Sequence, residues 1–473
     1  MIAICWFRRD LRLTDNPAFR AAAAAGRVLP VFLVDKALRA QGAASRWRLE
    51  RSLHALGADL RWRGGTLAVI EGEAAALVEL ARRAGATEVH ATAWPDPAQR
   101  RADEVVASAL AREGRRLVLH DGHTLLPPAT LRTGSGGGFK VYGAFARALR
   151  RQGVPPPVSV SVRIRWAPAV DGTLALPDVA LASDMRRGEA VVARFAPPAG
   201  EAAALDRLAD FRDRISGYVT GRDRPDRPDA TSGLSDALAV GEISARTLWA
   251  AAEAMAGDPA LASAAEKFMA ELIWRDFAWS LLDGFPQITE RSWRADWDAF
   301  PWRKDASDLV AWQRAMTGEP LVDAGLRELY VTGRMHNRVR MVVASYLAKH
   351  LLLDWRAGLA WFADTLIDWD PASNAMNWQW VAGSGPDASP FFRIFNPAAQ
   401  AEKFDPKGDY RARWLYGWRG SRSAEGRAWF EAVPRTWGLD TEAPYPDRPI
   451  VDLAAGRQRA LDALQAMRAA RAD

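Results

Sequence analysis

The stretch IAICWFRRDLRLTDNPAFRAAAAAGRVLPVFLV, which covers residues 2–34, predicts the fold at the start of the chain. Ile2–Phe7 and Val28–Val34 are short, nearly unbroken apolar runs, and such runs are typical of strands that a parallel sheet buries on both faces. A polar turn and an alanine-rich segment separate the two runs. A strand, a helix and a second strand in this order predict an α/β domain.

The alanine-rich segment, Ala18–Ala25, is expected to be a helix. Thr14 and Asp15 are both suitable N-cap residues, because their side-chain oxygens accept hydrogen bonds from unpaired backbone N–H groups. Pro17 suits the first helical turn, where its missing N–H leaves no hydrogen bond unmade.

The alternation of strands and helices continues to about residue 120. Further strands are expected at Thr66–Ile70, Glu88–Ala91 and Arg116–Leu119, and further helices at Arg46–Leu56, Ala74–Ala84 and Ala98–Ala111. Gly57 is expected to end the helix that precedes it, since glycine is frequent just after helices. We therefore predict a doubly wound, Rossmann-like parallel-sheet domain over residues 1–125.

The remainder of the chain has a different composition. Residues 126–199 hold the glycine-rich run 134–138, the proline run 155–157 and one expected helix, Tyr142–Arg151, so a long interdomain linker is predicted there. Residues 200–473 repeatedly show the i, i+3, i+4 spacing of amphipathic helices. Helices are expected at Glu201–Tyr218, Ala245–Ala256, Leu261–Leu282, Leu309–Thr317, Leu321–Leu329, Arg338–His350, Trp355–Leu366 and Ala455–Ala470. The predicted fold class is α/β plus α, with an all-helical C-terminal domain.

Composition excludes several classes of protein. The single cysteine, Cys5, excludes an internal disulfide framework and an iron–sulfur cluster held by several thiolates. The six histidines show no metal-binding spacing, so no metal is expected. No apolar run is long enough for a transmembrane helix, so no membrane association is expected. Arg8 interrupts the first apolar run too early for a signal peptide, and a reducing, cytoplasmic location is expected.

Two features of the composition are unusual. Lys and Arg total 63 against 57 Asp and Glu, which gives a net charge of +6, and 56 of the 63 cations are arginines. Arginine binds phosphate in a bidentate manner, which favours a nucleic-acid partner, although codon usage in a GC-rich genome explains the bias equally well. The 21 tryptophans suit a large core, stacking on a flat ligand, or one-electron chemistry.

Polar motifs in the helical part are candidate functional residues. On a helix, Glu271, Trp274 and Arg275 share one face, where they line a polar cavity or form an exposed Glu–Arg pair beside a half-buried indole. Tyr218 and the hydroxyl-rich segment 231–235 suit a diphosphate ligand, and a plain helix cap by Ser235 is the alternative.

A second group of polar motifs follows residue 333. The arginine-rich run 333–341 is expected to turn polar groups inward. The segment 368–374 has neither helical nor strand periodicity, and we expect a carboxylate-rich loop in which Asp368 or Asp370 pairs with Arg340. The indoles that flank the next glutamine, at positions 378 and 380, are either core residues or contacts to a ligand.

Motifs along the whole chain resemble those of the DNA photolyase/cryptochrome family. They are the segments 5–16, 215–218, 231–235, 241–244, 271–277, 332–341, 368–385 and 392–397, in the order typical of that family. Because these motifs are long and specific, the chain is identified as a member, most similar to bacterial cyclobutane pyrimidine dimer (CPD) photolyases.

The resemblance implies FAD, bound non-covalently in the helical domain. The implied contacts are Tyr218, Thr231, Ser232, Gly233, Leu234, Ser235, Arg340, Asp368, Asp370 and Asn374. Within this set, Arg340 and Asp368 match an ion pair against the flavin, and Asn374 matches the residue that faces flavin N5. For a second, antenna chromophore, three alternatives are left open: a deazaflavin, a folate in a different binding mode, or no antenna. Thr289 and Glu290 replace the Cys-Lys pair of a common bacterial folate pocket, so folate in that binding mode is not expected.

The reaction implied by the resemblance is light-driven. Reduced FAD gives an electron to a pyrimidine dimer that is flipped out of DNA, the cyclobutane ring splits, and the electron returns. Trp274 and Trp380 match the indoles that stack on the dimer. The implied DNA-contacting residues are Arg222, Glu271, Trp274, Arg275, Asn337, Met341, Trp380, Arg393 and Gln400, and the implied catalytic residues are Glu271, Asn374, Trp378, Trp355 and Trp302. Trp378, Trp355 and Trp302 match the chain of indoles that reduces photoexcited flavin.

The resemblance also favours one member of the family. Asn337 and Met341 occupy positions where (6-4) photolyases and animal cryptochromes have histidines, and Asn374 differs from the Asp or Cys of plant and insect cryptochromes. Both differences favour a CPD photolyase, expected to act on dimer-containing DNA as a monomer without an obligate protein partner. The alternatives are a (6-4) photolyase, a cryptochrome-like blue-light photoreceptor that signals through a protein partner, and a generic nucleotide-binding protein.

Overall fold

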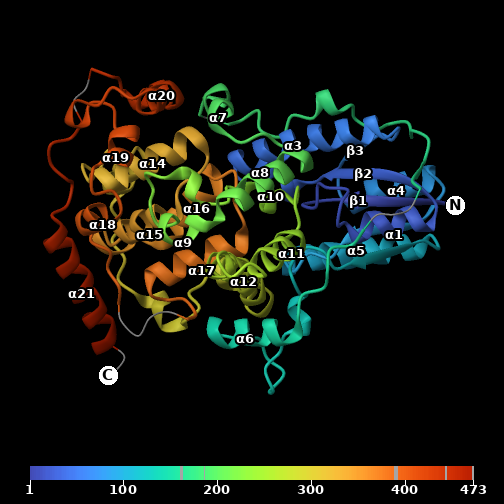
Figure 1. Cartoon of the computed structure of the whole chain (residues 1–473), viewed down its shortest axis with the longest axis horizontal. Coiled ribbons are helices and arrows are strands. Elements are labelled where there is room, and N and C mark those ends of the chain that lie inside the picture. Colours follow the sequence, from blue (N-terminus) through green and yellow to red (C-terminus); the bar gives the residue numbers. More distant parts are fainter. Residues whose placement is uncertain (160–162, 186, 388–391, 443–444, 471–473) are drawn as a thin grey trace. The chain divides into compact units, whose positions relative to one another are not determined.

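The computed structural model describes residues 1–159, 163–185, 187–387, 392–442 and 445–470. The chain forms two compact units, whose elements are labelled in Figure 1. The first unit comprises Met1–Ser183, Pro198–Val219 and Ser232–Pro286, and the second comprises Asp184–Pro197, Thr220–Thr231 and Gln287–Asp473.

A parallel sheet forms the centre of the first unit. Its strands are β1 (Ile2–Phe7), β2 (Arg27–Val34), β3 (Ala68–Glu71), β4 (Ala86–Thr92), β5 (Arg116–His120) and β6 (Arg165–Trp166). The hydrogen-bonded order is β3-β2-β1-β4-β5, with β6 paired to β2, and every pairing is parallel. β1 lies at the centre because its residues are apolar and nearly all buried. The predicted doubly wound sheet is confirmed, since the strand order reverses direction at β1.

Two layers of helices cover the sheet of the first unit. Cys5 and Phe7 of β1 share one hydrophobic cluster with α1 (Pro17–Ala25) and α3 (Ala43–Trp62). The alternate residues Ile4 and Trp6 share another cluster with α4 (Ala74–Arg83) and α5 (Pro97–Arg112). Successive side chains of a strand point to opposite faces, so β1 anchors both layers.

The first helix is capped by Asn16, and the expectation of Thr14 or Asp15 as its cap is wrong. Asn16 has the extended backbone that an N-cap requires (φ −115°, ψ 96°), and its side chain accepts a hydrogen bond from Phe19 N at 2.9 Å. Asp15 instead has a positive φ of 46°, and its carboxylate accepts from Val158 N at 2.6 Å. Pro17 begins the helix as predicted.

Gly57 does not end the second long helix, which is a further correction to the sequence-based expectation. α3 continues through Gly57 to Trp62. A Cβ at residue 57 would overlap the side chain of Leu176, so glycine is required there by close packing rather than by a turn.

The first unit also contains most of the helices between residues 142 and 284. They are α6 (Tyr142–Gln152), α8 (Glu201–Arg214), α10 (Ser235–Val240), α11 (Ala245–Ala256) and α12 (Ala262–Gly284), while α9 (Tyr218–Gly221) lies where the chain passes between units. The short helix α2 (Lys36–Arg39) also belongs to the first unit. α6 packs on α12 through Phe145 and Phe277, whose ring centroids are 5.4 Å apart.

The second unit is helical, as predicted. Its helices are α7 (Glu189–Phe195), α13 (Ala306–Gln313), α14 (Pro320–Thr332), α15 (Asn337–Ser345), α16 (Trp355–Thr365), α17 (Pro371–Ala382), α18 (Pro397–Phe404), α19 (Asp409–Trp414), α20 (Ala424–Ala432) and α21 (Leu453–Ala469). A π-helical turn, Tyr346–His350, continues α15. Neither α7 nor β6 was expected, since both are short elements inside the stretch predicted as linker. Within the described part of the chain, no helix has the length and apolar character needed to cross a lipid bilayer.

Candidate functional site

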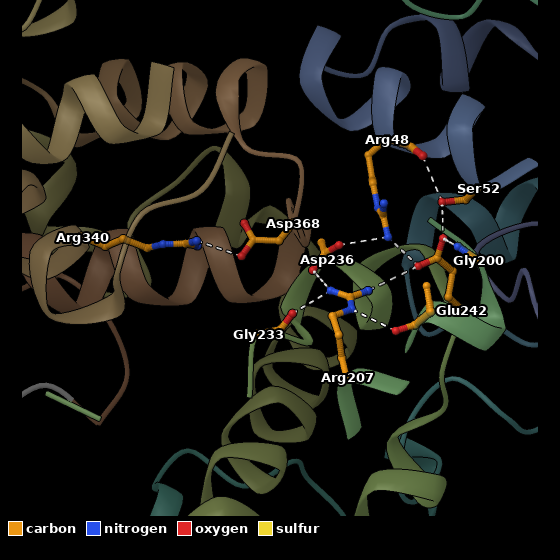
Figure 2. A network of polar contacts seen from close by, with 10 residues as sticks. Arg48, Ser52, Gly200, Arg207, Gly233, Asp236, Glu242, Arg340 and Asp368 are labelled. Atoms are coloured by element: carbon orange, nitrogen blue, oxygen red, sulfur yellow. Dashed lines mark hydrogen bonds and ion pairs between the residues drawn. The ribbon is translucent and has the colours of Figure 1, made fainter. Parts of the chain in front are cut away.

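Arg340 and Asp368 form an ion pair in the second unit, as predicted. Arg340 Nη2 donates to Asp368 Oδ2 at 2.8 Å, and Arg340 Nε donates to Met335 O at 2.8 Å (Figure 2). The Asp368 side chain is 3% exposed and that of Arg340 is 26% exposed. The buried carboxylate therefore fixes a guanidinium that keeps part of its surface accessible to an anionic ligand.

Asp370 has a different role from Asp368. Its side chain accepts a hydrogen bond from Ser373 N at 2.7 Å and caps α17, which begins at Pro371. The expected loop over 368–374 is therefore wrong beyond Asp370. An Asp followed by Pro is a helix-start signal, and it outweighs the lack of periodicity in so short a segment. Asn374 lies in the first turns of α17, where its Nδ2 donates to Leu359 O at 3.1 Å.

Three tryptophans of the second unit bury their indole N–H groups. Trp378 and Trp355 are core residues, and Trp302 is half-buried with its ring 4.4 Å from that of Phe300. Within the described residues, none of the three N–H groups has a hydrogen-bond acceptor. The N–H group of an oxidised indole is acidic. Because these N–H groups lack a hydrogen-bond acceptor in the part of the chain that the structure describes, an oxidised indole here would keep its proton and pass its positive charge to another group. Gly358 makes room for Trp378, because a Cβ there would overlap its ring.

Trp380 and Arg393 lie together in the second unit. The Arg393 guanidinium is 5.7 Å from the centroid of the half-buried Trp380 ring and 5.9 Å from that of Phe395. Gln379 between the two indoles of α17 is buried, and its Nε2 donates to Ile288 O at 2.6 Å. Trp378 thus belongs to the core, whereas Trp380 retains accessible ring surface beside a cation.

The other predicted site residues of the second unit lie on or near α15. Asn337 is exposed at the start of α15, and Met341 is half-buried one turn later. Asp223, the neighbour of the half-buried Arg222, pairs with Arg338 at 3.0 Å, so the 220–231 segment lies against α15. Gln400 is half-buried on α18.

The loop before α10 is held by a buried ion network in the first unit. Arg207 Nη1 donates to Gly233 O at 2.7 Å and to Asp236 Oδ1 at 2.9 Å. Arg48 reaches Asp236 at 2.9 Å and Glu242 at 2.5 Å (Figure 2). The Arg48, Asp236 and Glu242 side chains have no exposed surface, and two arginines balance two carboxylates.

This network fixes the geometry of the 232–235 segment. Burial raises the pKa of Glu242, although Arg48, Ser52 and the N–H of Gly200 favour its charged form. Sequence reasoning missed the network, although the charge of Asp236 directly after Ser235 was a usable signal. Because the Gly233 carbonyl accepts a hydrogen bond from Arg207, contacts within the protein itself order the loop.

The hydroxyl-rich segment suits a diphosphate. Gly233 has a φ of +64°, in the left-handed region that favours glycine. Ser235 is exposed, and α10 has no side-chain cap, so the plain-cap alternative for Ser235 is wrong. Hydroxyl donors beside a left-handed glycine fit a bound phosphate group. Tyr218 is buried against Phe211, while Thr231 belongs to the second unit.

The α12 motif does not contain the Glu271–Arg275 pair that was the alternative interpretation. Glu271 instead pairs with Lys267 at 3.5 Å. Arg275 donates to His123 O at 2.9 Å and contacts His123 Nε2 at 3.2 Å. His123 Nε2 also accepts from Trp94 Nε1 at 3.1 Å, so its proton resides on Nδ1. Burial, assisted by Arg275, lowers the pKa of His123 well below its usual value, which keeps the ring neutral.

Trp274, on the same helix, is half-buried and stacks on Tyr142, a residue that sequence reasoning did not select. In the described part of the chain, no cluster of three or more His, Cys, Asp or Glu side chains is suited to a metal ion.

Comparison with known proteins identifies related sequences over most of the chain. Residues 3–161 match the family model described as DNA photolyase, and residues 268–466 match the FAD binding domain of DNA photolyase. A deoxyribodipyrimidine photo-lyase of Agrobacterium fabrum is 42% identical over 478 residues, which cover 98% of both chains.

Solved structures give the same result. A bacterial class III photolyase from Agrobacterium tumefaciens is similar with a TM-score of 0.85 at 42% identity, covering 98% of this chain and 97% of that one. A cryptochrome from Synechocystis has a TM-score of 0.85 at 27% identity, covering 97% of this chain and 98% of that one.

Proposed function

The chain belongs to the DNA photolyase family, and from this premise we infer that it is a deoxyribodipyrimidine photo-lyase, a lyase that repairs pyrimidine dimers in DNA under light. The observation that carries this function is the 42% identity to a photo-lyase of that name over nearly the full length of both chains. The fixed Arg340–Asp368 pair and the ordered 232–235 segment are consistent with it.

FAD is the cofactor of this reaction. When bound, it supplies in its reduced form the light-excited electron that opens the cyclobutane ring and then takes that electron back. We propose that Arg340 places its positive charge beside the flavin, that Asp368 orients Arg340, and that the Asn374 amide faces the flavin ring. Ser232, Gly233, Leu234 and Ser235, together with Tyr218, Thr231 and Asp370, are the remaining proposed contacts. The residues present fit this cofactor, since they offer hydroxyl and guanidinium donors to its anionic groups.

The DNA-contacting residues are proposed to divide into two kinds. Trp274 and Trp380 present indole surfaces for stacking on a flipped dimer. Glu271 lies on the same helix as Trp274, and Asn337 and Met341 lie on α15; all three are proposed as further contacts to the dimer. Arg222, Arg393 and Gln400 are proposed to act on the DNA backbone. Arg275 remains a member of the proposed DNA-contacting set, although its guanidinium donates to His123 in this structure. Stacking discriminates damaged from undamaged DNA, whereas cations bind phosphate of any sequence.

The buried indoles are proposed to serve a separate electron route. Trp378, Trp355 and Trp302 would carry an electron inward to oxidised flavin, while repair uses an electron that leaves reduced flavin. Their N–H groups, which lack acceptors among the described residues, support this role. We further propose that the protein is a monomer and that it works in the cytoplasm, a reducing compartment that suits its free, buried Cys5.

A cryptochrome-like photoreceptor and a (6-4) photolyase are the competing functions. A direct test illuminates the reduced protein with duplexes that carry either one CPD or one (6-4) photoproduct, and scores the remaining damage by lesion-specific nicking. We expect loss of the CPD in blue light and none in the dark. Loss of the (6-4) lesion alone would favour the second class, and loss of neither would favour a photoreceptor.

A further inference from the structure

Trp274 is held by an aromatic partner from a distant part of the chain. The rings of Tyr142 and Trp274 are stacked with centroids 3.6 Å apart and an angle of 3° between their planes. Phe277 meets both rings edge-on, with centroid distances of 6.0 Å to Tyr142 and 5.9 Å to Trp274. One face of the indole is therefore covered by the protein, and the half-buried side chain keeps surface elsewhere.

The Tyr142 ring is itself fixed. Its hydroxyl donates to Ala270 O at 3.1 Å, one turn before Trp274 on α12. Burial and the nearby Glu271 raise the pKa of Tyr142 to about 12, so the hydroxyl remains a donor at physiological pH. An ion pair between Arg150 and Glu266, at 2.8 Å, ties the far end of α6 to α12. Tyr142 is thus positioned before any ligand arrives.

Such a stack has a consequence for binding. An indole that is free to change rotamer must be ordered when a base stacks on it, and this ordering lowers affinity. A parallel aromatic pair contributes stabilisation beyond that of the buried area, and it holds the indole in one plane. Stacking by a base on the other face then requires no rearrangement of the indole.

We propose that Tyr142 is a positioning residue, which presets the Trp274 indole so that its uncovered face receives a base of the flipped pyrimidine dimer. This inference rests on the proposed function, because it assumes that Trp274 stacks on the dimer. It assigns α6, an element of the stretch between the sheet and the C-terminal helices, to damage recognition. Tyr142 itself contacts neither the DNA nor the reacting bonds.

The test compares three variants for dark binding to CPD-containing and undamaged duplexes. Tyr142→Leu removes the stack and is expected to lower the ratio of the two affinities by about three- to tenfold. Tyr142→Phe keeps the ring and should retain most of the ratio. Phe145→Leu is the matched control, because Phe145 packs α6 on Phe277, whereas the ring stacked on Trp274 is that of Tyr142, and the ratio for Phe145→Leu should equal that of wild type.

Two further measurements separate positioning from a general loss of structure. Tyr142→Leu combined with Trp274→Ala should have the same ratio as Trp274→Ala alone, because the tyrosine acts through the indole. The indole bands of the near-ultraviolet circular dichroism spectrum should change in Tyr142→Leu but not when the same substitution is made in Trp274→Phe. If Tyr142→Leu loses its flavin, Tyr142→Met replaces it as the variant without a ring.

The outcomes distinguish this inference from the proposed function. Three results would overturn the role of Tyr142 while light-driven repair by wild type stands. They are a wild-type affinity ratio in Tyr142→Leu, a fall in that ratio no larger than the fall in Phe145→Leu, and additive effects of the two substitutions on the ratio in the double variant. Absence of repair by wild type would overturn the proposed function, and the inference with it.

Discussion

Replacing Arg340 by Ala removes the cation that faces a buried carboxylate. The pair is 2.8 Å long, and Asp368 is nearly inaccessible. At an effective dielectric constant of about 20, the Coulomb attraction at this distance is about 6 kcal/mol. Arg340 is 26% exposed, however, so screening and desolvation reduce the net value to about 2 kcal/mol, typical of a hydrogen bond between charged groups.

We therefore expect Arg340→Ala to lower the free energy of unfolding of the second unit by about 2 kcal/mol, or its melting temperature by about 4–8 °C. FAD occupancy should fall as well, since the same cation is proposed to face the flavin. Arg340→Lys keeps the charge but loses the second donor, and an intermediate result is expected.

Arg338 provides the matched control on the same helix. Its partner Asp223 is 43% exposed, so Arg338→Ala should cost less than about 1 kcal/mol. Thermal denaturation and the flavin absorbance of each purified variant are the measurements. If Arg340→Ala melts like Arg338→Ala and keeps a full complement of reducible FAD, the pair has no role in stability or in cofactor binding.

Three other perturbations test separate parts of the account. Trp378→Phe should slow photoreduction of oxidised flavin at least tenfold, while repair by chemically reduced enzyme persists; photoreduction at the wild-type rate would identify another donor. Arg222→Ala should weaken binding to damaged and undamaged duplexes alike and reduce the salt slope of log K by about one, and an unchanged slope would remove Arg222 from the DNA surface. Burial lowers the pKa of His336 to about 4, against about 6.5 in an unfolded chain. As the pH is lowered, the unfolded state therefore binds the proton first. The free energy of unfolding should decrease once the pH is below about 6.5, and it should be about 2 kcal/mol lower at pH 5. Since His336 Nδ1 caps α15, His336→Asn should keep the cap and flatten that pH dependence in urea denaturation, and an unaltered dependence would contradict the assignment.

Sequence patterns predicted the elements whose signals are local. β1 and β2 follow directly from apolar runs, and the long helices follow from their spacing. The cap of α1 was misassigned because three consecutive residues, Thr14, Asp15 and Asn16, all suit that role. Only the backbone conformation distinguishes them, and tertiary contacts of Asp15 determine it.

The candidate site shows the same division. From the residues alone, the Arg340–Asp368 pair was one of two alternatives, and the choice between them required recognising Asp370-Pro371 as a helix start; the family resemblance favoured Asp368. The contact between Tyr142 and Trp274 carried no sequence signal, because the two residues belong to helices that are far apart along the chain. Contacts of that kind depend on tertiary packing, which periodicity does not encode.

The function inferred for this protein is the light-driven splitting of pyrimidine dimers. Its most direct test is the recovery of pyrimidine ultraviolet absorbance when chemically reduced, FAD-loaded protein is mixed with dimer-containing oligonucleotide and illuminated. We expect recovery that grows with light dose and stops in the dark. No recovery in the light, or equal recovery in the dark, would contradict it.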